Sequence, residues 1–302
     1  TFHLLNLNLP KSKKKYLFIG LGTMGYPMAG HLSKNKELEL FVYNRTKSIT
    51  TKWLNHHKGF AFQFDELLKI KFDGLIVCLK DDASIINVLV NQKLIRYLKH
   101  NTFILDHSTT SLQLIDLINS DKHIIKNNIS FYDAPVSGGE VGAINGVLSI
   151  MIGGPNNKIP FLKKIMSAYS KSIVHIGPSG HGQLTKMVNQ LCIAGLIQAL
   201  SEGISLGQSA GLNMNKVLEA ISNGAAQSWQ MDNRFKTMIK KEFDFGFAVS
   251  LMIKDLKIAL NEAQDKNLDL QISNIILQNY KKLLELGDGT LDTSSLIKLI
   301  KT

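Results

Sequence analysis

The feature that most constrains this sequence is a short glycine-rich segment between an apolar run and a helical stretch. Residues 16–19 are apolar and predict a buried strand, and the pattern Gly20-x-Gly22-x-x-Gly25 follows directly. Gly20 permits a tight turn, Gly22 lets the backbone approach a pyrophosphate, and Gly25 lets the next helix pack closely on the strand. The helix N-terminus offers free N–H groups to phosphates, and a second strand is expected at 38–43. We therefore expect a dinucleotide to bind at the turn formed by Gly20, Leu21, Gly22, Thr23, Met24 and Gly25.

The end of the second strand indicates which dinucleotide is preferred. An NAD site usually places an acidic residue there, to bind the ribose 2′-hydroxyl, whereas this chain has Asn44-Arg45-Thr46. No carboxylate would repel a 2′-phosphate, and Arg45 and Thr46 offer a guanidinium and a hydroxyl to it. We predict NADP(H) over NAD(H); the alternative is that Arg45 is an ordinary solvated surface residue.

Strands and helices alternate along the first part of the chain, which predicts an α/β Rossmann domain with a mostly parallel, doubly wound sheet. Helices are expected at 24–34, 83–98 and 156–169, and strands at 16–20, 38–43, 74–79, 102–105, 129–132, 147–152 and 172–176. After Gly177-Pro178-Ser179-Gly180 only helical periodicity remains, beginning with a long helix at 183–210. The predicted organisation is a basic N-terminal arm (1–15), a Rossmann domain (16–178) and an all-helical domain for substrate binding and dimerisation (179–302).

Composition limits the class of protein. The chain has 302 residues with 44% hydrophobic and 20% charged residues, and no apolar run approaches the roughly 20 residues that span a bilayer. Cys78 and Cys192 both lie in apolar stretches and are expected to be buried thiols in a cytoplasmic protein. The histidines show no metal-ligand spacing, so no metal is expected. The net charge of +11 is spread along the chain, which favours anionic small molecules over nucleic acid or a membrane.

Two loops after predicted strands carry polar groups suited to a ligand. Ser108-Thr109 has hydroxyls that can bond a nicotinamide ribose or carboxamide, although this segment alone favours a cap for a helix at 111–118. Ser137-Gly138-Gly139 exposes backbone N–H groups and a hydroxyl without side-chain bulk, an arrangement that suits a carboxylate; the alternative is a flexible loop.

The start of the long helix places Lys186, Asn189 and Gln190 on one face. A lysine can act as a general acid toward a carbonyl if burial or another cation lowers its pKa. Lys254, which interrupts an apolar helical stripe, is a candidate for that cation. The alternative for both lysines is that they extend to solvent along their aliphatic stems.

Together these motifs resemble the β-hydroxyacid dehydrogenase family, which includes 3-hydroxyisobutyrate dehydrogenases and tartronate, glyoxylate and succinic semialdehyde reductases. The glycine fingerprint, Asp-x-Ser-Thr, Asp-Ala-Pro-Val-Ser-Gly-Gly, Gly-x-Gly-Gln-x-x-Lys-x-x-Asn and Lys-Asp-Leu occur in the family's order and spacing after residue 15. The resemblance implies that Lys186 is the catalytic acid/base. It also implies a substrate site and further cofactor contacts, made respectively by Ser137, Gly138, Gly139 and Asn189, and by Leu79, Lys80, Thr109 and Lys254.

The chain departs from the family's usual pattern at Lys80, where many members have an uncharged residue. Lys80 either adds a positive group near the cofactor or is an ordinary surface charge. The segment Gly224-Ala-Ala-x-Ser228-Trp229 is closer to the semialdehyde reductases than to the valine-pathway enzymes. We therefore expect an NADP(H)-dependent enzyme acting on a short anionic carboxylate and assembling as a homodimer or homotetramer. An NAD-dependent 3-hydroxyisobutyrate or tartronate semialdehyde enzyme is one alternative. A non-catalytic protein that binds a dinucleotide or a nucleic acid is the other.

Overall fold

The computed structural model describes residues 13–64 and 70–300. Contacts divide the chain into two compact units, the first running to Ser108 and then from Leu112 to Gly182. The second unit comprises Thr109–Ser111 and the chain from Gln183 onward. Most of the predicted basic arm lies outside the described residues, but Lys14 and Lys15 already belong to the first strand.

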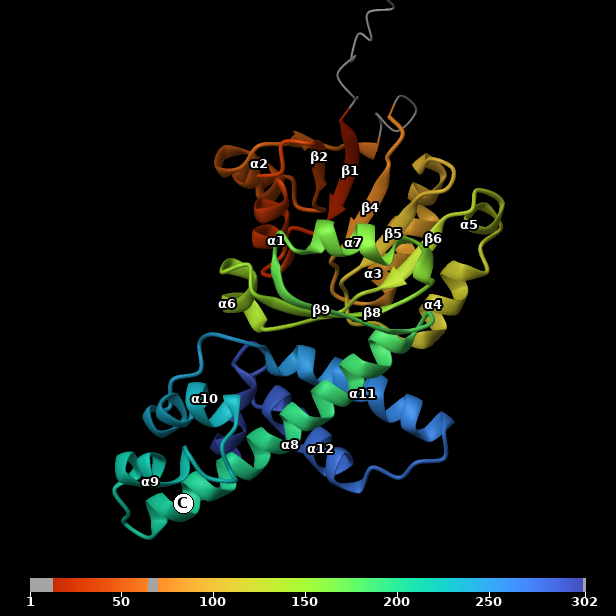
Figure 1. Cartoon of the computed structure of the whole chain (residues 1–302). Helices are drawn as coiled ribbons and strands as arrows, with labels where there is room; N and C mark the ends of the chain where they lie inside the picture. Colours follow the sequence, from red (N-terminus) through yellow and green to blue (C-terminus); the bar gives the residue numbers. More distant parts are fainter. Residues whose placement is uncertain (1–12, 65–69, 301–302) are drawn as a thin grey trace, which may run out of the picture. The chain divides into compact units, whose positions relative to one another are not determined.

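The first unit is built on one nine-stranded sheet with the order β3-β2-β1-β4-β5-β6-β8-β7, in which β9 also pairs with β8 (Figure 1). Neighbouring strands are parallel, except that β8 runs antiparallel to β6 and β7. The strands are β1 (Lys14–Ile19), β2 (Leu38–Tyr43), β3 (Phe60–Ala61), β4 (Gly74–Val77), β5 (Phe103–Asp106), β6 (Ser130–Asp133), β7 (Val136–Ser137), β8 (Leu148–Gly153) and β9 (Ser170–Gly177). The predicted mostly parallel sheet is confirmed.

Helices cover both faces of this sheet because successive strand residues point to opposite sides. Tyr16 and Phe18 of β1 enter one core with side chains of α1, α2 and α7, whereas Leu17 and Ile19 enter a second core with α3 and α4. The helical segments are α1 (Gly25–Leu32), α2 (Lys47–His56), α3 (Asp82–Ile86), a π-helical turn (Asn87–Asn91), two 3-10 turns (Leu94–Tyr97 and Asn156–Lys158), α4 (Leu112–Asn119), α5 (Lys122–Lys126), α6 (Gly139–Ile144) and α7 (Ile159–Met166).

The predicted helix at 83–98 is not continuous. It is α3, a π-helical turn and a 3-10 turn, with Lys93 in the left-handed region at φ 57° between the last two. A residue with positive φ cannot continue a right-handed helix. The prediction of one continuous helix for this segment was therefore wrong, although Ile85, Val88 and Leu89 are buried in the core.

The second unit contains only helices among the described residues, as predicted. They are α8 (His181–Ser209), α9 (Met214–Ile221), α10 (Trp229–Lys240), α11 (Val249–Asp265), α12 (Gln271–Glu285) and a 3-10 segment (Thr293–Leu299) (Figure 1). One core cluster joins Ala194 and Ile197 of α8 to Leu256 of α11 and Tyr280 of α12. A second cluster is centred on Phe235 of α10.

The two cysteines do not both have the burial that we predicted. Cys78 follows β4 and is half-buried, and burial raises the pKa of its thiol to about 12. Cys192 is exposed on α8, so the prediction of a buried thiol there was wrong. The apolar neighbours of Cys192 in sequence misled the prediction, because Val188 and Leu196 on the same helix are exposed as well.

Candidate functional site

The glycine-rich turn between β1 and α1 is tightly packed at two of its three glycines. Gly20 has a φ of +95°, and a Cβ atom there would lie 2.1 Å from the carbonyl oxygen of Cys78. A Cβ atom on Gly25 would lie 1.8 Å from the carbonyl oxygen of Gly20. A Cβ atom on Gly22 would meet nothing within 4 Å, so the protein itself does not require a glycine there. That open position fits the close approach of a pyrophosphate to the backbone.

The end of β2 is tied directly to this turn. The backbone N–H of Leu21 donates to Asn44 Oδ1 at 3.0 Å, and Asn44 Nδ2 donates to the carbonyl oxygen of Thr46 at 3.3 Å. Arg45 and Thr46 are exposed, and the Thr46 hydroxyl does not cap α2. The structure thus brings residues 20–25 and 44–46 together, with a guanidinium and a hydroxyl at the surface and no carboxylate in the 44–46 segment. These groups fit a 2′-phosphorylated ribose.

The ends of β4 and β5 meet through a buried serine that the sequence analysis considered as a ligand group or helix cap. Ser108 Oγ accepts the backbone N–H of Leu79 at 2.8 Å, and the Ser108 N–H donates to Asp106 Oδ1 at 2.9 Å. Burial raises the pKa of Asp106 to about 7. Ser108 therefore holds the chain just before Lys80, whose side chain is exposed.

Asp106 and the neighbouring histidine do not form a catalytic dyad. His107 contacts the Ala134 carbonyl oxygen through Nδ1 and the Tyr169 hydroxyl through Nε2, at 2.7 and 2.8 Å. Burial lowers the pKa of His107 to about 4, so the imidazole is neutral at physiological pH. Its role in the described structure is to join β5 to neighbouring segments.

The Ser137-Gly138-Gly139 segment is held in place rather than forming a flexible loop. Ser137 lies in β7 and pairs with Ser149 of β8, and Gly139 begins α6. Gly138 and Gly139 have φ values of +128° and +61°, which side chains disfavour. A Cβ atom on Gly139 would meet nothing within 4 Å, so this backbone is open to a small ligand.

The second unit brings together Lys186, Asn189 and Gln190 of α8 with Lys254 and Asp255 of α11. Lys186 is buried, with 7% of its surface exposed. Burial is the main cause that lowers its pKa to about 8; Asp255 raises the pKa and Lys254 lowers it further. The lysine does not extend to solvent, so this alternative from the sequence is wrong for Lys186.

Lys254 has a different environment, since its side chain is partly exposed. Its Nζ donates to the carbonyl oxygen of Thr109 at 2.6 Å and lies 3.0 Å from Asp255 Oδ1. Thr109 and Lys254, each predicted as a cofactor contact, are therefore in direct contact within the second unit, through the backbone of Thr109.

Some polar residues of these clusters were missed as functional residues. Asp255 is buried and bonded to Gln190, yet the two are 65 residues apart in sequence. Asp133 is also buried, and its Oδ1 accepts the backbone N–H of Gly180 at 2.8 Å, next to the start of α8. Two features of the sequence could have identified these residues. Asp133 is a carboxylate at the end of a buried strand, and Asp255 is a carboxylate next to a lysine in an apolar helix.

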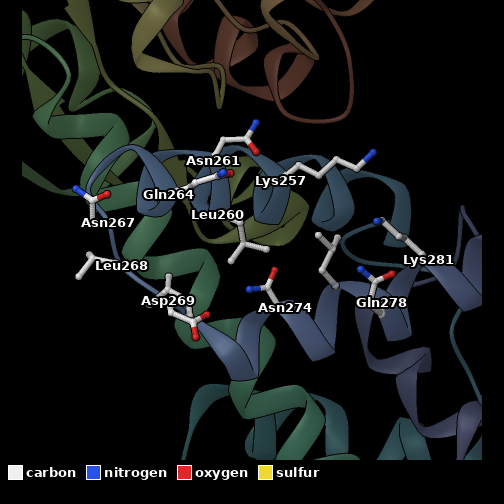
Figure 2. A pocket seen from close by; sticks show the side chains of 12 residues that line it. Lys257, Leu260, Asn261, Gln264, Asn267, Leu268, Asp269, Asn274, Gln278 and Lys281 are labelled. Carbon is white, nitrogen blue, oxygen red and sulfur yellow. The ribbon is translucent and has the colours of Figure 1, made fainter.

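A surface groove of about 760 Å³ along α11 and α12 is a separate feature (Figure 2). Amide and lysine side chains line it, among them Asn261, Gln278 and Lys281. None of the predicted site residues lines this groove, and its charged side chains are exposed or half-buried. It is therefore not the candidate active site.

The described residues contain no group of three His, Cys, Asp or Glu side chains that could hold a metal ion. Within the same residues, no helix is long and apolar enough to cross a membrane.

Comparison with known proteins identifies the class that these features define. The protein-family model described as "NAD binding domain of 6-phosphogluconate dehydrogenase" matches residues 15–177. A second family model, described as "NAD-binding of NADP-dependent 3-hydroxyisobutyrate dehydrogenase", matches residues 180–300. The protein is thus an NAD(P)-dependent oxidoreductase acting on CH–OH donors. More specifically, the chain belongs to the 3-hydroxyisobutyrate dehydrogenase family of β-hydroxyacid dehydrogenases, which confirms the resemblance of its motifs.

Individual relatives match over nearly the full length of this chain. An uncharacterised oxidoreductase of Shewanella frigidimarina is 43% identical, with 94% of this chain and 97% of the relative covered. The probable 3-hydroxyisobutyrate dehydrogenase-like 1 of Arabidopsis thaliana is 35% identical, with 95% and 85% covered. The solved structure of a Mycobacterium tuberculosis 3-hydroxyisobutyrate dehydrogenase shares the fold with a TM-score of 0.85 at 21% identity, covering 96% of this chain and all of that one.

Proposed function

We propose that the protein transfers hydride between NADP(H) and a short β-hydroxy- or semialdehyde carboxylate, with Lys186 as the general acid/base. The observation that carries this proposal is that Lys186, on the same helix as Asn189, has only 7% of its surface exposed, and this burial lowers its pKa to about 8. A general acid or base works best when its pKa lies near the operating pH. A lysine with an ordinary pKa near 10.5 would release its proton far less readily.

The preference for NADP(H) is supported by the groups at the end of β2. Arg45 is exposed and makes no hydrogen bond or ion pair within the described part of the chain, so its guanidinium is available to a phosphate. Residues 20–25 would hold the pyrophosphate, and Thr109 and Lys254 are proposed to contact the cofactor as well. A bound nicotinamide cofactor would supply or accept the hydride.

The other site residues are proposed to bind and orient the substrate. Ser137, Gly138 and Gly139 would bind its carboxylate through a hydroxyl and backbone N–H groups. Lys186 would donate a proton to the oxygen that becomes an alkoxide during reduction, and Asn189 would orient that oxygen. Oxidation of the hydroxyacid would use the same lysine as a base.

The test is spectrophotometric oxidation of NADPH, with NADH in parallel, against succinic semialdehyde, glyoxylate, methylmalonate semialdehyde and tartronate semialdehyde. We expect turnover with NADPH well above NADH for at least one substrate. Preference for NADH would refute the role of Arg45 while leaving the family unchanged. Absence of turnover with either cofactor would contradict the proposed substrate class.

The role of Arg45 can be tested separately with a matched control. Arg45→Ala should raise the KM for NADPH roughly tenfold or more and leave the KM for NADH nearly unchanged, because a charge-assisted bond to the 2′-phosphate is lost. Lys52→Ala removes one positive charge from the exposed surface of α2 and should change neither value. Equal effects of the two substitutions would show only a general dependence on charge.

We also propose that the protein assembles as a homodimer or homotetramer through α8. Three apolar side chains of this helix, Val188, Leu196 and Leu206, are 61%, 43% and 73% exposed. Large apolar side chains exposed on one helix favour burial against another chain. Light scattering should give a mass of two or four chains, and Leu206→Glu should reduce it; a monomeric wild-type protein would contradict the proposal.

A further inference from the structure

Asp255 is a buried carboxylate beside the proposed general acid/base, and the mechanism above gives it no role. Only 3% of its surface is exposed. Its Oδ2 accepts a hydrogen bond from Gln190 Nε2 at 2.7 Å, and its Oδ1 lies 3.0 Å from Lys254 Nζ. Within the described residues, Oδ1 accepts no hydrogen bond of good geometry, so its contact with Lys254 is essentially electrostatic. A buried carboxylate is costly unless its charge is compensated, and here Gln190 and Lys254 supply that compensation.

The first consequence of this carboxylate is that it orients two side-chain amides in series. A carboxylate can only accept hydrogen bonds, so Gln190 must turn its NH₂ group toward Asp255. The Gln190 carbonyl oxygen then points the other way and accepts Asn189 Nδ2 at 2.8 Å. Asn189 is therefore held with one N–H on Gln190, and among the residues that the structure describes its carbonyl oxygen and second N–H have no other hydrogen-bond partner, which leaves them for a ligand. Without the carboxylate, either amide could rotate by 180°.

The second consequence is electrostatic. Lys186 is buried close to two charged groups, the carboxylate of Asp255 and the ammonium of Lys254, both on α11. The segment Thr109–Ser111 contributes a carbonyl oxygen to Lys254 and no charged side chain. Asp255 opposes the effects of burial and of Lys254 on the proton affinity of Lys186.

We propose that Asp255 is a positioning residue, which fixes the Asn189 amide through Gln190 and keeps Lys186 protonated beside Lys254. It touches neither substrate nor cofactor in this scheme. The consequence for turnover rests on the function proposed above, but the amide chain and the charge balance are properties of the protein alone. They can therefore be tested without any substrate.

The decisive experiment is an NMR titration of the Lys186 side chain in protein carrying isotope-labelled lysine. The signal is identified by its absence from Lys186→Met. We expect Asp255→Asn to lower the midpoint by about one pH unit or more, the effect of losing a nearby opposite charge. As a matched control, Glu262→Gln removes an acid from the same helix that pairs with Lys266, and it should leave the midpoint unchanged.

Two further variants keep the test informative if Asp255→Asn does not fold. Lys254→Gln should move the Lys186 midpoint upward, opposite to the effect of removing Asp255. Gln190→Met should leave the midpoint within a few tenths of a unit but raise the substrate KM several-fold, because only the amide chain is broken. A Lys186 midpoint that responds to neither Asp255 nor Lys254 would overturn the proposal.

Failure of this inference and failure of the proposed function give different results. If the midpoints move as expected but no hydroxyacid or semialdehyde reacts, the proposed function is wrong and the positioning role of Asp255 stands. If turnover is found while the midpoint of Asp255→Asn equals that of the wild type, the positioning role is wrong. In an active enzyme, the limb of the pH–rate profile assigned to Lys186 should shift with the NMR midpoint.

Discussion

Replacing Lys186 by methionine should abolish turnover and at the same time stabilise the protein. Burial lowers the pKa of Lys186 from the ordinary 10.5 to about 8. Each pKa unit corresponds to about 1.36 kcal/mol, so the lowered pKa amounts to about 3 kcal/mol against keeping the ammonium in the folded protein. Methionine has a similar length and no charge, so Lys186→Met should raise the free energy of unfolding at pH 7 by roughly this amount.

The stability gained by Lys186→Met should depend on pH, because the lowered pKa of Lys186 changes the protonation of the folded chain. Below pH 8 both the folded and the unfolded chain hold the Lys186 proton, so the full penalty is present. Between pH 8 and 10.5 the unfolded chain binds more protons than the folded one, and wild-type stability rises with pH. The advantage of Lys186→Met should therefore be largest at pH 7 and shrink above pH 8.

Thermal and urea unfolding at pH 7 and pH 9.5 would measure this difference. A gain of about 3 kcal/mol corresponds to roughly 6–12 °C in Tm for a domain of some 150–250 residues. Lys257→Met, at an exposed position of α11, is the control and should change stability by less than about 0.5 kcal/mol at either pH. A Lys186→Met protein that is less stable than wild type at pH 7, or whose advantage does not depend on pH, would refute the reasoning.

Three other substitutions test two buried carboxylates and the glycine-rich turn. Burial raises the pKa of Asp106 from 3.8 to about 7, so the stability of the wild type should fall as the pH rises from 3.8 to 7. Above pH 7, Asp106→Asn should be more stable than wild type by up to about 4 kcal/mol. Melting curves at pH 4.5 and 8 check this, and an equal difference at both would contradict it. Gly25→Ala places a methyl group against the Gly20 carbonyl oxygen and should weaken NADPH binding, measured by fluorescence titration, at least tenfold; unchanged affinity would contradict the packing argument. Arg234→Met leaves the fully buried Asp292 without its cation and should lower the urea unfolding free energy by about 3 kcal/mol, whereas a loss below about 1 kcal/mol would mean that the backbone donors to Asp292 suffice.

The strands that the sequence predicted well are those whose burial is visible locally. The prediction of 38–43 coincides with β2, since a run of apolar residues with turn residues on both sides is a strong strand signal. The strands β3 and β7 were missed because each has two residues, too few to show any periodicity. They exist because their neighbours β2 and β8 supply pairing partners, which is information from tertiary structure.

The candidate site also has residues that the sequence identified and partners that it did not. The glycine turn, the 44–46 segment and Lys186 were found because each lies within one contiguous motif. Gln190 was placed correctly on the face of Lys186, but its partner Asp255 comes from another helix. Sequence periodicity shows that a charged pair interrupts an apolar stripe; it does not show which of the two side chains is buried.

Helix α8 shows why amphipathic patterns fail at such a site. Gln183, Lys186 and Gln190 are nearly fully buried, whereas Val188 on the same helix is 61% exposed. A helix that only had to fold would reverse this arrangement. The buried polar side chains are held instead by specific partners, such as the hydrogen bond from the Thr110 N–H to Gln183 Oε1. Conflict between local pattern and burial is expected where function constrains the residues.

Under the proposed function, the charge balance around Lys186 would allow one lysine to serve the reaction in both directions. With a pKa of about 8, roughly one molecule in ten carries the neutral amine at pH 7, compared with roughly one in three thousand at the ordinary value of 10.5. The ammonium needed to reduce a carbonyl and the amine needed to oxidise a hydroxyl are then both populated. Burial and Lys254 alone would move the pKa further down and deplete the acid form. Asp255 opposes this shift, so in the proposed mechanism the buried carboxylate would keep the lysine usable as an acid as well as a base.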